Sequence, residues 1–118
     1  MKLLGIDHIQ IAIPAGGEET GRAFYGTILG LKELPKPESL AGRGGAWFEL
    51  GRIGVHLGVD PDFHPATKAH PAFIVDDLVN LQKNLKDKGC TVSDAEPVAG
   101  KRRYFTVDPF GNRLEFTE

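Results

Sequence analysis

Three of the four histidines in this chain occupy positions typical of metal ligands. His8 opens the alternating segment HIQIAI, His56 lies between apolar neighbours in VHL, and His70 opens HPAFIV. An imidazole on a rigid strand is a common ligand for a divalent metal and also a common general base. The fourth histidine, His64, lies in the polar segment DFHPAT, and we expect it to be a solvated loop residue.

The spacing of two glycines adds a carboxylate to these imidazoles. From Gly30 to His56 is 26 residues, and from Gly89 to Glu115 is also 26. Glu115 lies between apolar neighbours in LEF, as His56 does in VHL. Fe, Ni, Co, Mn and Zn all accept imidazole nitrogen and carboxylate oxygen, so one divalent metal is the predicted cofactor. The predicted ligands are His8, His56, His70 and Glu115. His56 has a second interpretation, as a catalytic base.

The predicted strands and helices that position these residues follow the same order twice along the chain. Alternation of apolar and polar residues predicts strands, and the order is βαβββ, linker, βαβββ. The first module is predicted at 1–59, the linker at 60–69 and the second module at 70–118. The expected strands are GIDHIQIAI, LKELPKP, AWFEL and GVHLGV in the first copy, and HPAFIV, CTVSDAE, RRYFTV and NRLEFT in the second.

Each copy also contains one predicted helix that ends at a glycine. The first is EETGRAFYGTIL, with Phe24 and Ile28 on one face, and Gly30 ends it in the left-handed conformation. The second is DDLVNLQKNLKDKG, which an aspartate caps and Gly89 ends. Its apolar face is Leu78, Leu81 and Leu85. The segment ESLAGRGG is expected to be a glycine-rich turn or a mobile loop.

Period-2 alternation indicates which side chains surround the predicted metal. Gln10 shares a strand face with His8, and Arg113 shares one with Glu115. On the strand before, Arg103 and Phe105 alternate with Arg102 and Tyr104. A guanidinium suits an anionic group of a substrate, although a solvated surface charge is an equally good interpretation of either arginine of the pair. The predicted substrate-binding residues are Gln10, Arg103, Phe105 and Arg113.

Composition excludes several classes of protein. The 118 residues suit one compact domain or two small joined modules, and the net charge of −2 without a basic stripe argues against a nucleic-acid partner. The apolar runs are too short to span a membrane, and the N-terminus does not resemble a signal peptide. A single cysteine, Cys90, excludes a disulfide framework. We therefore expect a cytoplasmic protein.

The sequence resembles the vicinal oxygen chelate superfamily, which includes glyoxalase I, extradiol dioxygenases, fosfomycin-resistance thiol transferases and bleomycin-resistance proteins. The resemblance is carried by IDHIQIAIP, FYGTILGLKE, HPAFIVDDL and DPFGNRLEF, in this order and spacing. It implies an α+β fold in which paired βαβββ modules form a cupped, partly open barrel. It also implies a homodimer and metal ligands that match His8, His70 and Glu115, with His56 as a fourth.

The resemblance leaves the reaction open. Glyoxalase I usually has a glutamate where this chain has His56, and VAGKRR lacks the serine and acidic residues of the fosfomycin enzymes' cation loop. A metal-dependent lyase, isomerase or dioxygenase acting on a small oxygen-rich substrate is the first hypothesis, with Glu115 or His56 as the base. The alternatives are a bleomycin-resistance-type protein that sequesters a ligand and a thiol transferase acting on an epoxide antibiotic.

Overall fold

The computed structural model describes all residues, 1–118, and they divide into two units, Met1–His64 and Pro65–Glu118. The predicted linker 60–69 contains the point of division. Each unit is a βαβββ module with a four-stranded mixed sheet, as the sequence predicted. No helix is long and apolar enough to cross a membrane.

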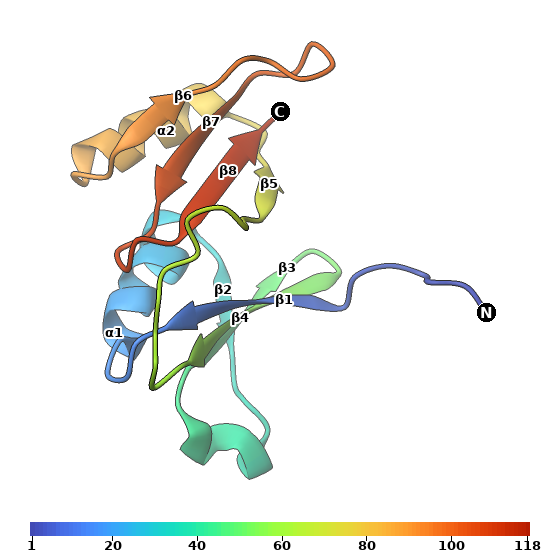
Figure 1. The fold of residues 1–118 in the computed structure, drawn as a ribbon, viewed down its shortest axis with the longest axis vertical. Coiled ribbons are helices and arrows are strands. Elements are labelled where there is room, and N and C mark those ends of the chain that lie inside the picture. The colour runs from blue at the N-terminus through green and yellow to red at the C-terminus, as the bar shows by residue number, and fades with distance from the viewer. The chain divides into compact units, whose positions relative to one another are not determined.

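The sheet of the first unit has the strand order β1-β4-β3-β2 (Figure 1). Strands β1 and β4 are parallel, and the other neighbours are antiparallel. A helical segment follows β1, and a short 3-10 segment separates β2 from β3. The elements are β1 (His8–Ile13), α1 (Glu18–Gly21), the π-helical η1 (Arg22–Ile28), β2 (Lys32–Leu34), the 3-10 segment η2 (Glu38–Arg43), β3 (Ala46–Leu50) and β4 (Ile53–Val59).

The second unit repeats this topology with the strand order β5-β8-β7-β6. Its first and last strands, β5 and β8, are again parallel, and the remaining pairs are antiparallel. The helix α2 begins where the Asp77 side chain accepts a hydrogen bond from the Asn80 backbone N–H, as the predicted cap requires. The elements are β5 (Ala72–Ile74), α2 (Leu78–Asp87), β6 (Val92–Asp94), β7 (Arg103–Val107) and β8 (Arg113–Thr117).

One face of each sheet packs against the helix of its own unit and forms the core. In the first unit Phe24 and Tyr25 are buried with Ile13, Phe48 and Val55. In the second unit the buried side chains of α2 and the sheet are Leu78, Leu85, Tyr104, Leu114 and Phe116. The opposite face of each sheet is therefore left for the polar residues that the sequence singled out.

The first helix differs from the prediction. Beyond Gly21 it widens into a π-helix, in which the Leu29 N–H donates to the Phe24 carbonyl oxygen at 2.9 Å. Because a π-helical turn holds more residues than an α-helical turn, Phe24 and Ile28 do not form the expected apolar face. The adjacent residues Phe24 and Tyr25 are both buried instead, and Ile28 is half-buried. Gly30 ends the segment with φ +77°, as predicted.

Three further segments also depart from the expected pattern. The segment predicted to be a turn or mobile loop contains η2, a short 3-10 helix over Glu38–Arg43. The first strand begins at His8 rather than at residue 5, because its pairing with β4 begins there. The first hydrogen bond between the two strands runs from the Gly54 N–H to the Asp7 carbonyl oxygen. His70 precedes β5, which begins at Ala72.

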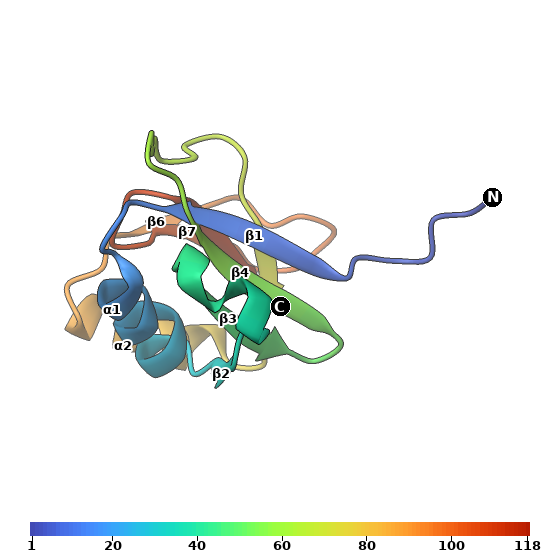
Figure 2. The ribbon, with the colours of Figure 1, turned by 90° about the horizontal axis from the view of Figure 1, so that it is seen from below.

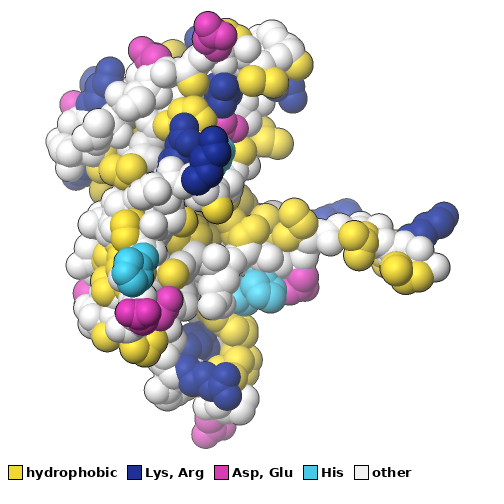
Figure 3. Space-filling view, viewed as in Figure 1, with side chains coloured by type: hydrophobic (Ala, Val, Ile, Leu, Met, Phe, Trp, Pro, Cys, Tyr) yellow, Lys and Arg dark blue, Asp and Glu magenta, His cyan; other side chains and the backbone are white.

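Residues 1–7 form an exposed apolar arm that extends from β1 away from the rest of its unit (Figures 1 and 2). Figure 3 shows hydrophobic side chains spread along this arm. Leu3 and Leu4 are 95% and 96% exposed, and Ile6 is 66% exposed. Large apolar side chains gathered on one solvated segment are typical of a surface that contacts another molecule.

Candidate metal centre

The strand register places the two predicted ligand pairs at equivalent positions of their units. In the first unit Gln10 pairs with His56 across β1 and β4, and in the second unit Ala72 pairs with Glu115 across β5 and β8. The other member of each predicted ligand pair is a histidine two residues before Gln10 or Ala72, namely His8 in the first unit and His70 in the second. Each histidine is thus a diagonal neighbour of the ligand on the last strand. The repeat that was inferred from spacing is present in the backbone pairing.

The imidazoles of His8 and His56 stack on each other in the first unit. Their ring centroids lie 4.3 Å apart, with 17° between the planes. On its other side His56 stacks on Trp47, at 4.2 Å and 6°. Trp47 is the residue directly opposite His56 in the β3–β4 register, so the pairing of strands fixes this contact. The ring of His56 is held between two flat side chains.

A glycine makes room for this stack. A side-chain Cβ at Gly54 would lie 2.9 Å from Nε2 of His56 and 3.2 Å from Cβ of His8. Both distances are below ordinary van der Waals separation, so any larger residue would displace one of the imidazoles. Sequence reasoning did not identify Trp47 or Gly54 as part of the site. Trp47 lies opposite His56 on β3, and Gly54 lies two residues before His56 on β4; these positions are the signal that could have found them.

The first histidine of each pair is oriented by a hydrogen bond at Nδ1. Nδ1 of His8 lies 2.8 Å from the Asp7 carboxylate, and Nδ1 of His70 lies 2.9 Å from the Lys68 carbonyl. Both oxygens are acceptors, so Nδ1 carries the proton and the neutral ring keeps a lone pair at Nε2. This arrangement is typical of metal-binding histidines, whose second nitrogen donates to a carboxylate or carbonyl.

Burial lowers the pKa of His56, and the neighbouring His8 lowers it further. Asp7 acts in the opposite direction with a smaller effect, and Lys36 adds to the lowering. A lowered pKa favours the neutral imidazole, which is the form that binds a metal.

A cleft of about 650 Å³ opens beside the histidine pair of the first unit. Gln10 lines it together with His8, as the alternation of β1 predicted. Glu49 is exposed and also lines this cleft, together with Trp47. The volume suits a small molecule.

The second unit pairs an imidazole with a carboxylate. Nε2 of His70 lies 3.9 Å from Oε1 of Glu115. The same oxygen accepts a hydrogen bond at 2.6 Å from Nη1 of Arg103, whose Nε donates to the Glu96 carbonyl at 2.8 Å. Arg103 therefore neutralises Glu115 in this structure.

Phe105 lies at the centre of the same face. It is paired with Glu115 in the β7–β8 register. The guanidinium of Arg113 lies 3.9 Å from its ring centroid, and that of Arg103 lies 5.2 Å from it. The ring of His70 is nearly perpendicular to that of Phe105, with the two centroids 5.2 Å apart. The exposed Arg102 instead pairs with Glu118.

The structure thus brings the predicted site residues together in two groups. The first unit groups His8, Gln10 and His56, and the second unit groups His70, Arg103, Phe105, Arg113 and Glu115. Within neither unit do three potential metal-ligating side chains gather. His64 is exposed, as predicted, with Nδ1 at 2.9 Å from the Asp62 carbonyl. The assembly of four ligands around one ion stays a prediction.

The sequence profile of the Glyoxalase/Bleomycin resistance protein/Dioxygenase superfamily matches residues 5–116. The chain belongs to this superfamily. Among solved structures, a protein from Bacillus anthracis assigned to the glyoxalase family is 46% identical, with a TM-score of 0.95 over 100% of this chain and 97% of that one. No protein with a curated description matches.

Two more distant structures share the superfamily fold. One is a glyoxalase/dioxygenase from Nostoc punctiforme, at 22% identity and a TM-score of 0.76 over 96% of this chain and 89% of that one. The other is lactoylglutathione lyase from Agrobacterium tumefaciens, at 19% identity and a TM-score of 0.75 over 99% and 95%. At these identities the likeness shows the fold alone.

Proposed function

We propose that this member of the glyoxalase superfamily is a divalent-metal-dependent enzyme acting on a small substrate with adjacent oxygens. The observation that carries the proposal is the repeated register, which puts one pair of potential ligands at the same place in each unit. The same two-residue offset in both units supports a shared role for the two pairs. The proposed ligands are His8, His56, His70 and Glu115, from one chain or from two.

The donor set fits such an ion. Three imidazoles and one carboxylate suit Fe, Ni, Co, Mn or Zn, and the Nδ1 bonds of His8 and His70 leave Nε2 available. A bound ion would act as a Lewis acid toward the substrate oxygens. The chain itself would bind the substrate through Gln10, Arg103, Phe105 and Arg113, and would move a proton at His56 or Glu115. A lyase, an isomerase or a dioxygenase would each use these parts.

The two roles of His56 can be separated. In His56→Ala, retained metal with lost turnover supports a base, whereas lost metal supports a ligand. Its lowered pKa is compatible with both roles, because a ligand and a general base each need the neutral ring.

One observation favours a second function, the metal-free sequestration of a ligand. Arg103 already satisfies Glu115 at 2.6 Å, so the carboxylate has a partner without an ion. A protein of the bleomycin-resistance type would bind its ligand in the clefts without turnover.

Elemental analysis of the purified protein tests the proposal. We expect about one metal ion per site, lost in the double variant His8→Ala, Glu115→Ala and retained in His64→Ala, which removes an exposed histidine outside the site. The emission of the single tryptophan gives a second readout, since Trp47 contacts His56. It should change saturably when the metal-free protein is titrated with Co²⁺. No metal in any preparation, even after reconstitution with each candidate ion, would support sequestration instead.

We also propose a homodimer. The exposed apolar side chains of the arm support it, because association would remove them from water. Light scattering should give twice the chain mass, and the double variant Leu3→Ser, Leu4→Ser should shift it toward the monomer. A wild-type protein that stays monomeric at high concentration would contradict this proposal.

A further inference from the structure

The arginines of this chain differ in whether a carboxylate neutralises them. Three of them, Arg22, Arg103 and Arg113, are half-buried. Arg22 pairs with Glu19 and Glu33, and Arg103 pairs with Glu115. Arg113 has no carboxylate partner.

The Arg113 guanidinium lies over the ring of Phe105, 3.9 Å from the ring centroid. Withdrawing a cation from water without a counter-charge is unfavourable, and a cation–π contact offsets only part of that loss. The guanidinium N–H groups are left available to an external acceptor.

Arg113 lines a cleft of about 430 Å³ on the face of the sheet that carries Glu115. The lining includes the hydroxyl residues Thr67, Thr91 and Ser93 and the ring of Phe105. Ser93 pairs with Phe105, and Phe105 with Glu115, so all three side chains lie on one face. The cleft therefore combines an unneutralised cation, hydroxyl groups and an aromatic surface, beside the proposed metal ligand on β8.

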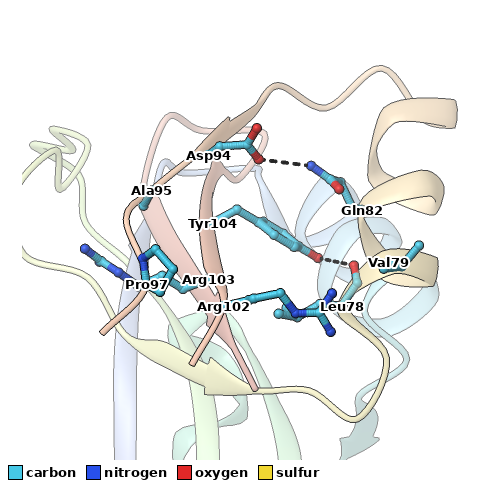
Figure 4. A pocket seen from close by; sticks show the side chains of 9 residues that line it. All are labelled: Leu78, Val79, Gln82, Asp94, Ala95, Pro97, Arg102, Arg103 and Tyr104. Carbon is cyan, nitrogen blue, oxygen red and sulfur yellow. Dashed lines mark hydrogen bonds between the residues drawn. The ribbon is translucent and has the colours of Figure 1, made fainter. Parts of the chain in front are cut away.

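The acidic residue at this cleft faces away from it. Asp94 contributes to the lining, but it follows Ser93 on β6 and so lies on the opposite face of the strand. Figure 4 shows its carboxylate directed toward Gln82 of α2, whose side-chain nitrogen donates to it at 3.4 Å. This contact belongs to a separate pocket of about 220 Å³ between α2 and the sheet, beside the Tyr104 hydroxyl bond to the Leu78 carbonyl.

We infer that Arg113 binds an oxyanion of the substrate, so that the substrate is a small organic acid carrying a carboxylate or a phosphoryl group. The inference rests on the proposed function only in calling the bound molecule a substrate. The binding of an anion at Arg113 itself requires no metal. A guanidinium donates two parallel hydrogen bonds to either group, and the hydroxyl groups of the cleft can donate to the remaining oxygens.

NMR titration of the metal-free protein tests this inference. The probes are benzoate, phenylphosphonate and the neutral isostere benzamide, whose rings match the aromatic surface of Phe105. At least one anion should bind about tenfold more tightly than benzamide and should shift the amide signals of Phe105 and Arg113. Tighter binding of benzoate assigns the site to carboxylates, and tighter binding of phenylphosphonate assigns it to phosphoryl groups.

Matched variants complete the test. Arg113→Gln should abolish the preference for the anion, Arg113→Lys should retain part of it, and Arg102→Gln, which removes an exposed arginine paired with Glu118, should leave it unchanged. Equal binding of benzamide and both anions, or an anion preference that survives in a folded Arg113→Gln, would overturn the inference. Failure of the metal proposal shows separately, as an absence of metal in elemental analysis.

Discussion

The two units place their predicted ligand pairs by the same register but surround them with different neighbours. In the first unit His56 lies between two flat rings, those of His8 and Trp47. In the second unit Glu115 accepts a charged hydrogen bond from Arg103. The backbone repeat therefore determines where a predicted ligand lies, whereas the side chains of neighbouring strands determine what it contacts.

The difference has a chemical consequence for each half. Stacking holds an imidazole plane without occupying its nitrogen atoms, so His56 is positioned and still has a donor atom to offer. An ion pair occupies the oxygen atom itself, so Glu115 must share Oε1 between Arg103 and any other partner. The first unit is an aromatic half-site and the second a charged one.

The largest expected effect tests whether the halves are equivalent. His8→Ala and His70→Ala remove corresponding imidazoles, and each should weaken metal binding by more than about 100-fold, beyond the loss typical of an outer-shell partner. Chelator competition measures the affinity, and His64→Ala is the control. If only one of the two variants loses metal, the halves do not contribute to one site in the way that their shared register suggests.

The next largest effect is a fall of about 2–3 kcal/mol in the free energy of unfolding at high pH. It arises at Tyr104 in the second unit, whose hydroxyl donates to the Leu78 carbonyl at 3.0 Å. Burial, with a smaller effect from Asp77, raises the pKa of Tyr104 from 10.0 to about 12. Below pH 10 the Tyr104 hydroxyl is protonated in both the folded and the unfolded state. Between about pH 10 and 12 the unfolded state loses it first, so the free energy of unfolding should fall.

Urea unfolding of wild type and Tyr104→Phe across this pH range measures that effect. The difference between the two proteins should depend on pH above about 10 and be constant below it. A parallel pH dependence in both proteins would show that Tyr104 does not contribute to the loss.

The helix caps of the two units predict a smaller effect. The Asp77 side chain caps α2, whereas Gly17 precedes α1 without any side-chain cap. Asp77→Ala should lower the free energy of unfolding by about 1 kcal/mol, as judged from urea denaturation. Asp77→Asn keeps an acceptor oxygen and should lose much less. Equal losses in both variants would assign the effect to the negative charge at the N-terminus of α2 rather than to the capping hydrogen bond.

The smallest expected effect is a gain in stability in the first helix. A Cβ at Gly26 would lie 3.4 Å from a ring carbon of Phe48, which is ordinary contact, and Gly26 has no positive φ. Gly26→Ala should therefore raise the free energy of unfolding by about 0.4–1 kcal/mol, mainly by restricting the unfolded chain. The matched change Gly89→Ala, at φ +80°, should be destabilising. A loss in Gly26→Ala would indicate that the π-helical turn needs the glycine.

Much of the fold could be read from local patterns. Alternation located the strands, and the glycines at 30 and 89 ended the helices with φ +77° and +80°. The 26-residue spacing anticipated that His56 and Glu115 would occupy equivalent register positions. The start of β1 and the π-helical turn were not predictable in this way, because they depend on where the parallel partner β4 begins and on how Phe24 and Tyr25 pack.

The sequence by itself determined the two modules, the face of the strand on which each candidate residue lies, and the repeat that relates His56 to Glu115. These follow from the period of strands and from the stop signals of helices, which are properties of the chain itself. Only the tertiary structure decided that Trp47 and Gly54 support His56, that Arg103 is neutralised and that Arg113 is not. Those outcomes depend on which side chains meet across paired strands, and alternation along one strand does not specify its partner.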